Sequence, residues 1–187
     1  MMSGYFWETE HIRLRQIEPD DWETFQQWDM DSETARNLDS LPLPRSKEWY
    51  RTWAQDEAKK THKDDNFSLV IEDIESGDFA GAISSHTTDR RIGTFSYGLA
   101  IHPNFQRCGY ATQAILLLMK YFFEELRYQK CTVTIHEWNT ASITLHERMG
   151  FVKEGQHRRM LYTQGRYWDV LYYGMTIEEW REKYKTD

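Results

Sequence analysis

The chain of 187 residues has 23 Lys and Arg against 30 Asp and Glu, a formal net charge of −7. This acidity argues against nucleic acid as the main partner, because phosphate binding needs a basic face, and it suits either solubility alone or a cationic substrate. No apolar stretch is long enough to span a membrane, and the N-terminal MMSGYFWETEH lacks the basic and apolar regions of a signal peptide. Two cysteines are too few for a disulfide framework or a zinc site. We therefore predict a cytoplasmic protein with no metal site and no membrane partner, folded as a single domain over residues 1–187.

The first half of the chain predicts a strand, two helices and then an antiparallel meander. Alternation of apolar and polar residues predicts a strand over 11–17. Pro19, followed by two acidic residues, opens one helix, and Ser46 is placed to cap a second. The segment 39–46 between them is interpreted as a loop. The expected strands of the meander are 67–74, 79–84 and 94–101, with a hairpin turn at 75–78.

The second half predicts a long helix, followed by a strand, a helix, a hairpin and a last helix. From Ala111 to Leu126, apolar residues recur at i, i+3, i+4 and i+7, the pattern of an amphipathic helix. Because this helix links the strand at 94–101 to a β-branched strand at 131–135, part of the sheet should be parallel or mixed. The remaining elements are a helix at 140–149 that ends at Gly150, strands from Phe151 and over 166–175, and a helix at 177–184.

A tight turn, Gln106-Arg-Cys-Gly-Tyr-Ala111, precedes the long helix, which starts without Ser, Asp or Asn at the expected cap. A helix N-terminus carries unpaired N–H groups and about half a positive charge. If the turn bends those amides inward, they form a cradle suited to a pyrophosphate, and Gly109 lets the backbone approach the ligand. Taken alone, six residues with one glycine are equally compatible with an ordinary strand-to-helix turn.

Motifs elsewhere in the chain give this turn a context. Gln106-x-x-Gly109-x-Ala111 resembles the [Q/R]-x-x-G-x-[G/A] acetyl-CoA signature of the GNAT superfamily of N-acetyltransferases. The pattern N-x-x-S…GF…EG, typical of the RimJ/RimL-type (ribosomal-protein-alanine N-acetyltransferase-like) branch, is matched by residues 139–142, 150–151 and 154–155. The first strand, central hairpin and C-terminal hairpin of that branch resemble residues 11–15, 79–83 and 165–169, the last together with Tyr172 and Trp180. The similarity spans about residues 7–180.

The resemblance implies the α/β (α+β) GNAT fold, a mixed and mostly antiparallel sheet of about seven strands with helices on both faces. It implies acetyl-CoA as donor substrate, with backbone groups of Leu99, Ala100 and Ile101 along the pantetheine arm and the thioester. The amides expected to hold the pyrophosphate are those of Gln106, Arg107, Cys108, Gly109, Tyr110, Ala111 and Thr112. Asn139 would contact the pantetheine arm, and Ser142 would lie near the CoA sulfur. Arg107 stands where the family often has Gly, and it either adds a cation beside the phosphates or faces solvent.

The resemblance says less about which residues act as acid and base in the reaction than about which residues bind the donor. Where many relatives carry a Glu on the strand before the turn, this chain has Thr94, which cannot act as a base. Where many carry a Tyr acid it has His146, and Ser142 is the alternative proton donor to the thiolate. The candidate bases are His86, just past the central strand, and Glu137, just past a later strand. Each is also compatible with a plain role, as a loop histidine or a solvated charge, and a chain of waters is a third route.

Three functions stay open at this level. The protein transfers acetyl to the N-terminal amine of a protein, or to a small cationic amine such as a polyamine, an amino sugar or an amino acid, or it binds CoA without catalysis. Four tryptophans either pack between the first two helices or line the acceptor cleft: Trp22, Trp28, Trp49 and Trp53. Exposed aromatic residues near the C-terminal hairpin would allow a homodimer.

Overall fold

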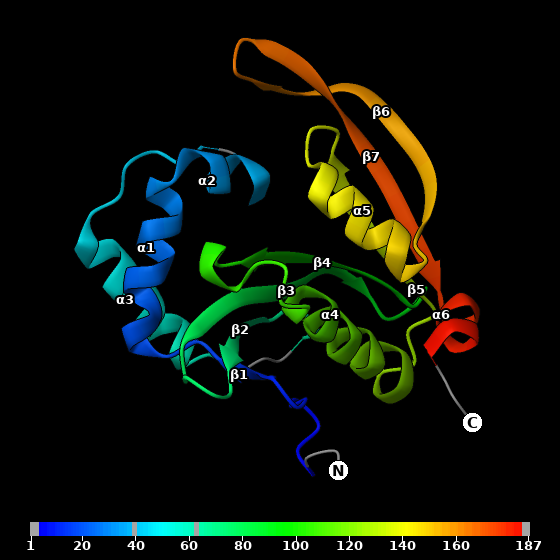
Figure 1. Cartoon of the computed structure of the whole chain (residues 1–187), viewed down its shortest axis with the longest axis horizontal. Helices are drawn as coiled ribbons and strands as arrows, with labels where there is room; N and C mark the ends of the chain where they lie inside the picture. Colours follow the sequence, from blue (N-terminus) through cyan, green and yellow to red (C-terminus); the bar gives the residue numbers. More distant parts are fainter. Residues whose placement is uncertain (1–3, 39–40, 62–63, 185–187) are drawn as a thin grey trace. The chain divides into compact units, whose positions relative to one another are not determined.

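The computed structural model describes residues 4–38, 41–61 and 64–184 (Figure 1). Over these residues the protein is a mixed α/β fold with seven strands and six α-helices. The strands are β1 (Ile12–Gln16), β2 (Ser68–Asp73), β3 (Phe79–Asp89), β4 (Thr94–Ile101), β5 (Lys130–His136), β6 (Val152–Thr163) and β7 (Arg166–Thr176). The helices are α1 (Trp22–Met30), α2 (Ser32–Leu38), α3 (Lys47–Ala58), α4 (Tyr110–Lys120), α5 (Thr140–Met149) and α6 (Ile177–Tyr184). None of these described helices is long and apolar enough to cross a membrane.

Hydrogen bonding joins the strands into one mostly antiparallel sheet in the order β1-β2-β3-β4-β5-β7-β6. The one parallel pairing recorded among the described strands is β4 with β5, where Phe95 stands opposite Cys131. The chain divides into two compact units, Met1–Ser85 with Gly98–Leu117 and His86–Tyr97 with Leu118–Asp187. Strands β3 and β4 and helix α4 each contribute residues to both units.

The first unit combines the β1–β2 ladder with the three helices α1, α2 and α3. Fully buried apolar side chains, among them Ile12 and Ile71, come from the two strands. Aromatic rings join the helices: the ring of Phe25 contacts those of Trp53 and Phe79 edge to face, at centroid distances of 4.7 and 5.3 Å. Such pairs add to the free energy of area burial. The predicted packing between helices is therefore confirmed for Trp53, which meets Phe25 of α1. Trp28 is buried against Phe25 of its own helix and Phe79 of β3, and Trp49 is 42% exposed.

The second unit is built on β5, β7 and β6, which pair antiparallel, with α5 and α6 nearby in sequence. Its core contains the stacked rings of Phe95 and Phe122, whose centroids lie 4.0 Å apart. Phe122 belongs to a π-helix over Tyr121–Glu125 that ends the long helix. Gly150, at φ 93°, takes the left-handed conformation that commonly ends a helix, and so stops α5.

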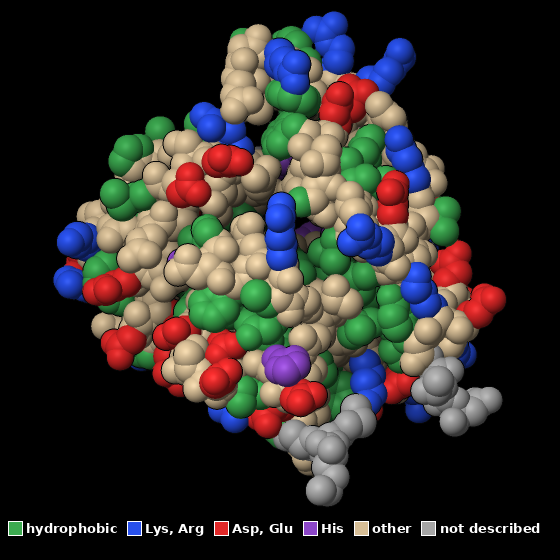
Figure 2. Space-filling view, viewed as in Figure 1, with side chains coloured by type: hydrophobic (Ala, Val, Ile, Leu, Met, Phe, Trp, Pro, Cys, Tyr) green, Lys and Arg blue, Asp and Glu red, His purple; other side chains and the backbone are tan. Residues whose placement is uncertain are grey.

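The hairpin of β6 and β7 is long and curved in Figure 1, and Figure 2 shows Lys and Arg side chains gathered at its outer end. Arg159 and Arg166 lie over the rings of Tyr167 and Trp168, at 4.5 and 3.3 Å from the ring centroids. Tyr162 and Tyr167 are 65% and 55% exposed. The exposure of aromatics that the sequence suggested is therefore confirmed, and the homodimer stays a prediction.

Apart from shifts of one residue at several strand ends and a 3-10 turn over Pro19–Asp21 that precedes α1, the element predictions are confirmed except at three places. The strand predicted to end at residue 84 continues to Asp89, so the interpretation of His86 as lying past the strand was wrong. Helix α2 was not predicted, because its seven residues are too short for a periodic pattern. The long helix ends as the π-helix rather than as regular α-helix. Residues 41–46 form a loop as predicted, and residues 39–40 of that segment lie outside the described residues.

Candidate active site

The turn before α4 has the backbone geometry of an anion cradle. Arg107 and Gly109 both have positive φ, 63° and 81°, so two nearby residues take the left-handed conformation. Gln106, Arg107, Cys108 and Gly109 are exposed, and the helix starts at Tyr110. A turn of this kind aims successive N–H groups to one side, and the helix dipole adds positive potential there. The geometry therefore suits a phosphate, and Arg107 occupies a conformation that glycine adopts without strain.

Hydrogen bonds fix this turn to other parts of the first unit. The backbone N–H of His102 donates to the carbonyl of Ala80 at 2.8 Å. The hydroxyl of Tyr110 donates to a carboxylate oxygen of Asp73, which holds the pKa of Asp73 below its ordinary value and raises that of Tyr110 to about 12. The other oxygen of Asp73 accepts from the backbone N–H of Ser76 at 2.8 Å. The first turn of α4 is thus attached to the β2–β3 hairpin through a carboxylate that the sequence did not single out.

The end of β4, where Leu99, Ala100 and Ile101 were expected along the pantetheine arm, is half-buried. At this point β3 approaches it closely: a Cβ built on Gly81 would stand 2.5 Å from the carbonyl oxygen of Ala100. Only glycine fits at position 81, because the clashing atom belongs to the backbone and cannot rotate away.

In the second unit, Asn139 and Ser142 lie at the start of α5. Asn139 is the N-cap, and its side-chain oxygen accepts a hydrogen bond of 3.0 Å from the backbone N–H of Ser142. This cap occupies the oxygen of Asn139 and leaves its NH₂ group as the donor for another partner. Ser142 is half-buried in the first turn of the helix.

A buried chain of hydrogen bonds joins Ser142 to His146 and Tyr97. The Nδ1 atom of His146 lies 2.7 Å from the carbonyl oxygen of Ser142 and 3.3 Å from its Oγ. On the other side of the ring, Nε2 lies 2.8 Å from the hydroxyl of Tyr97. Only 5% of His146 and 6% of Tyr97 are exposed. Burial lowers the pKa of His146 and raises that of Tyr97 well above its ordinary value.

The sequence had placed His146 at the position of a family acid but had not connected it with Ser142. The spacing contained the signal, because residues four apart lie on the same face of a helix. Tyr97, three residues after Thr94, matches a Tyr that the family often has on this strand, but no local signal pointed to its pairing with His146, 49 positions away.

The two candidate bases differ in their surroundings. One carboxylate oxygen of Glu137 accepts a hydrogen bond of 2.6 Å from the backbone N–H of Asp169, so Glu137 is engaged with β7. His86 is exposed on β3 with Nδ1 at 3.3 Å from the Thr87 hydroxyl, and partial burial of its ring lowers its pKa. Across residues 4–38, 41–61 and 64–184, no group of three or more His, Cys, Asp or Glu is arranged to hold a metal ion.

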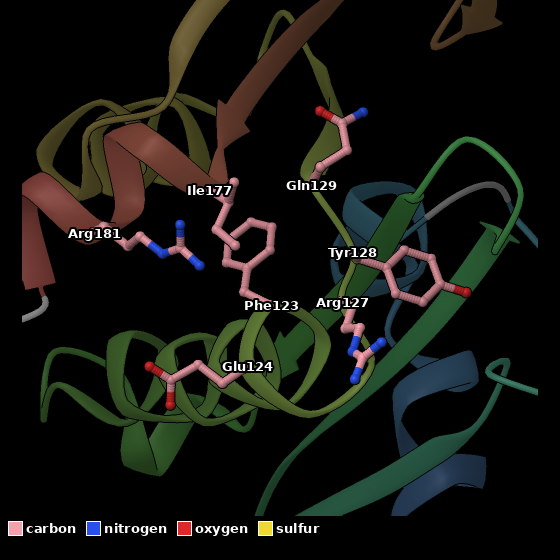
Figure 3. A pocket seen from close by; sticks show the side chains of 7 residues that line it. All are labelled: Phe123, Glu124, Arg127, Tyr128, Gln129, Ile177 and Arg181. Atoms are coloured by element: carbon pink, nitrogen blue, oxygen red, sulfur yellow. The ribbon is translucent and has the colours of Figure 1, made fainter.

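A separate cavity of about 570 Å³ opens in the second unit (Figure 3). Its lining residues are Phe123, Glu124, Arg127, Tyr128, Gln129, Ile177 and Arg181. In Figure 3 the side chain of Arg181 reaches toward Phe123 and Ile177. Its charged groups, Glu124, Arg127 and Arg181, are exposed. None of the residues predicted to bind the donor or to act as acid or base lines this cavity in the described part of the chain.

The chain belongs to the GNAT family of acetyltransferases, because the family model described as an acetyltransferase (GNAT) domain matches residues 11–152. It is therefore an acyltransferase, and enzymes of this fold use acetyl-CoA as donor. The SPbeta prophage-derived uncharacterized N-acetyltransferase YokL of Bacillus subtilis is 38% identical, over 95% of this chain and 97% of that protein. YdaF of Bacillus subtilis, whose name assigns it provisionally to the ribosomal N-acetyltransferases, is 29% identical over 91% and 94%. A crystal structure of a probable acetyltransferase superposes with a TM-score of 0.81 at 28% identity, covering 92% of this chain and 96% of that one.

Proposed function

We propose that the whole chain is one RimJ/RimL-type acetyltransferase domain that acts in the cytoplasm and transfers acetyl from acetyl-CoA to the N-terminal α-amine of a protein. The use of acetyl-CoA as donor is supported by the turn at Gln106–Gly109, whose positive-φ residues precede the start of α4. The choice of a protein N-terminus as acceptor rests on the resemblance of residues 139–155 to the RimJ/RimL branch and on the similarity to YdaF.

In this proposal the pyrophosphate of acetyl-CoA binds the backbone amides from Gln106 to Thr112, and the phosphate takes the place of a side-chain cap on α4. Arg107 adds a cation beside it. The backbone of Leu99–Ile101 pairs with the pantetheine arm. The free NH₂ group of Asn139, whose oxygen is used in the helix cap, donates to the same arm.

The transfer itself is direct. The neutral amine attacks the thioester carbonyl, a C–N bond forms, and the C–S bond breaks with its electron pair on sulfur. The amine loses one proton and the thiolate gains one, so the reaction balances without a metal or redox partner. Ser142 donates the proton to sulfur and recovers one from solvent. His86, Glu137 or a chain of waters accepts the proton of the amine.

The experiment is an assay of free thiol released from acetyl-CoA. One panel holds peptides with a free N-terminus, and its matched control holds the same peptides with a blocked N-terminus and an internal lysine. A second panel holds polyamines, amino sugars and amino acids. We expect turnover on the free N-termini alone. Turnover only on the small amines would overturn the acceptor assignment, and tight CoA binding without turnover on any amine would overturn catalysis.

A further inference from the structure

We propose that His146 is a positioning residue that keeps the hydroxyl proton of Ser142 off its own ring, so that this proton is available to the departing sulfur. The inference rests on the proposed function, because it assigns the partner that orients the proton donor in that reaction. The whole arrangement lies within the second unit, on α5 and β4.

The hydrogen bonds determine the tautomer of His146. The carbonyl oxygen of Ser142 can only accept, so the Nδ1 atom 2.7 Å away must carry a hydrogen. Burial disfavours the imidazolium form, so Nε2 carries a lone pair instead. The Tyr97 hydroxyl at 2.8 Å must then donate to Nε2, since two lone pairs cannot share a hydrogen bond. One neutral tautomer satisfies every polar atom of this buried chain.

This tautomer dictates what the Ser142 hydroxyl can do. Its oxygen lies 3.3 Å from the N–H at Nδ1, so that oxygen faces a donor and accepts a weak second hydrogen bond. The hydroxyl cannot donate back to the ring, because Nδ1 has no free lone pair. The proton of Ser142 therefore points away from His146. A histidine with its hydrogen on Nε2 would instead accept a hydrogen bond from the Ser142 hydroxyl at Nδ1. The Ser142 proton would then be held by the ring and unavailable to the sulfur.

The chemistry also limits the role of His146 to orientation. A full relay would move the Nδ1 proton to Ser142 and replace it through Nε2 with the proton of Tyr97. That relay ends in a tyrosinate in a site where only 6% of Tyr97 is exposed. Ionisation of a buried phenol is strongly disfavoured, so no proton passes along the chain.

A pair of substitutions separates orientation from mere packing. In His146→Asn the side-chain NH₂ falls near the position of Nδ1 and keeps a donor toward Ser142. In His146→Gln the amide falls near Nε2 and keeps only the contact with Tyr97. We expect kcat to fall about threefold for Asn and about thirtyfold for Gln, with the KM for acetyl-CoA within about twofold for both. An equal loss in the two variants, or a larger loss for Asn, would overturn the proposal.

A double-mutant cycle tests whether His146 acts through Ser142. Added to Ser142→Ala, the His146→Gln change should lower kcat no further, because the group it orients is already gone. If the two substitutions instead lower kcat by independent factors that multiply in the double variant, His146 acts elsewhere and the proposal is overturned.

Nuclear magnetic resonance of the ¹⁵N-labelled full chain tests the tautomer without any turnover. The His146 ring, assigned by its loss in His146→Gln, should give the neutral Nδ1–H pattern from about pH 7 to about pH 8. An Nε2–H or imidazolium pattern in that range would overturn the proposal. If the Nδ1–H tautomer is found and no amine is acetylated, the proposed function fails, and the catalytic role of His146 fails with it, while the hydrogen-bond assignment stands.

Discussion

The substitution Gly109→Ala tests the turn before α4, and the structure gives its magnitude. Gly109 has φ 81°, a conformation that disfavours L-residues by about 1–2 kcal/mol. Alanine also restricts the unfolded chain, which offsets about 0.4–1 kcal/mol of that strain. The nearest atom to an added Cβ is Nε2 of Gln113 at 3.9 Å, an ordinary contact, so no clash adds to the strain. We therefore expect a loss of about 1 kcal/mol in the free energy of unfolding.

Gly77→Ala is the matched control for this change. Gly77 lies in the β2–β3 turn of the same unit with φ 74°, and a Cβ there would meet nothing within 4 Å. The strain is the same, so the stability of this variant should fall by the same amount. It stands outside the residues expected to bind CoA, so it separates the effect of strain from the effect on the ligand.

The assays are urea unfolding and CoA titration by calorimetry on both variants. Both should lose about 1 kcal/mol of stability, whereas only Gly109→Ala should weaken CoA binding, by tenfold or more, about 1.4 kcal/mol. The reason is that the methyl group, and any relaxation of φ it causes, moves the amides of the turn away from the phosphate. Gly109→Val should abolish binding. If Gly109→Ala binds CoA within twofold of Gly77→Ala, the cradle does not bind the pyrophosphate and the reasoning fails.

Three further outcomes are expected. Ser142→Ala should lower kcat more than tenfold in the thiol assay, and a change below twofold would remove Ser142 as proton donor. The pKa of Asp73 is depressed in the folded state by the Tyr110 hydroxyl, so its contribution to stability is present above the unfolded pKa near 3.9 and is lost as pH falls through the lower folded pKa. Between about pH 7 and about pH 3, the urea midpoint should therefore fall less for Asp73→Asn than for the wild-type protein. An equal fall in the two proteins would contradict the role assigned to Asp73. Gly81→Ala would place Cβ 2.5 Å from the carbonyl oxygen of Ala100 and should cost about 1–3 kcal/mol, so unchanged stability would refute the close approach of β3 to β4.

Local patterns in the sequence were enough to predict most of the elements. The helix at Thr140–Met149 was predicted to the residue, because Asn139 caps it and Gly150 stops it, and both signals lie within one turn of the helix ends. Strand β4 was predicted from its own composition in the same way. The extension of β3 to Asp89 was missed, because Ser-Ser-His-Thr-Thr is typical of a loop and only tertiary pairing makes it a strand.

The sequence by itself determined the family, the turn at Gln106–Gly109 and the position of Ser142 in the first turn of its helix. These features depend on neighbours within a few residues, and spacing along the chain encodes them. Tertiary structure alone decided that Tyr97 meets His146 and that Asp73 meets Tyr110, contacts that span 49 and 37 positions. Neither pairing is encoded in a local pattern, because each joins a strand to a helix far away in the sequence and depends on how those elements pack. The tautomer of His146 depends on both levels: the carbonyl oxygen of Ser142, four positions away, places the hydrogen on Nδ1, and burial of the ring in the folded protein leaves Nε2 to accept from Tyr97.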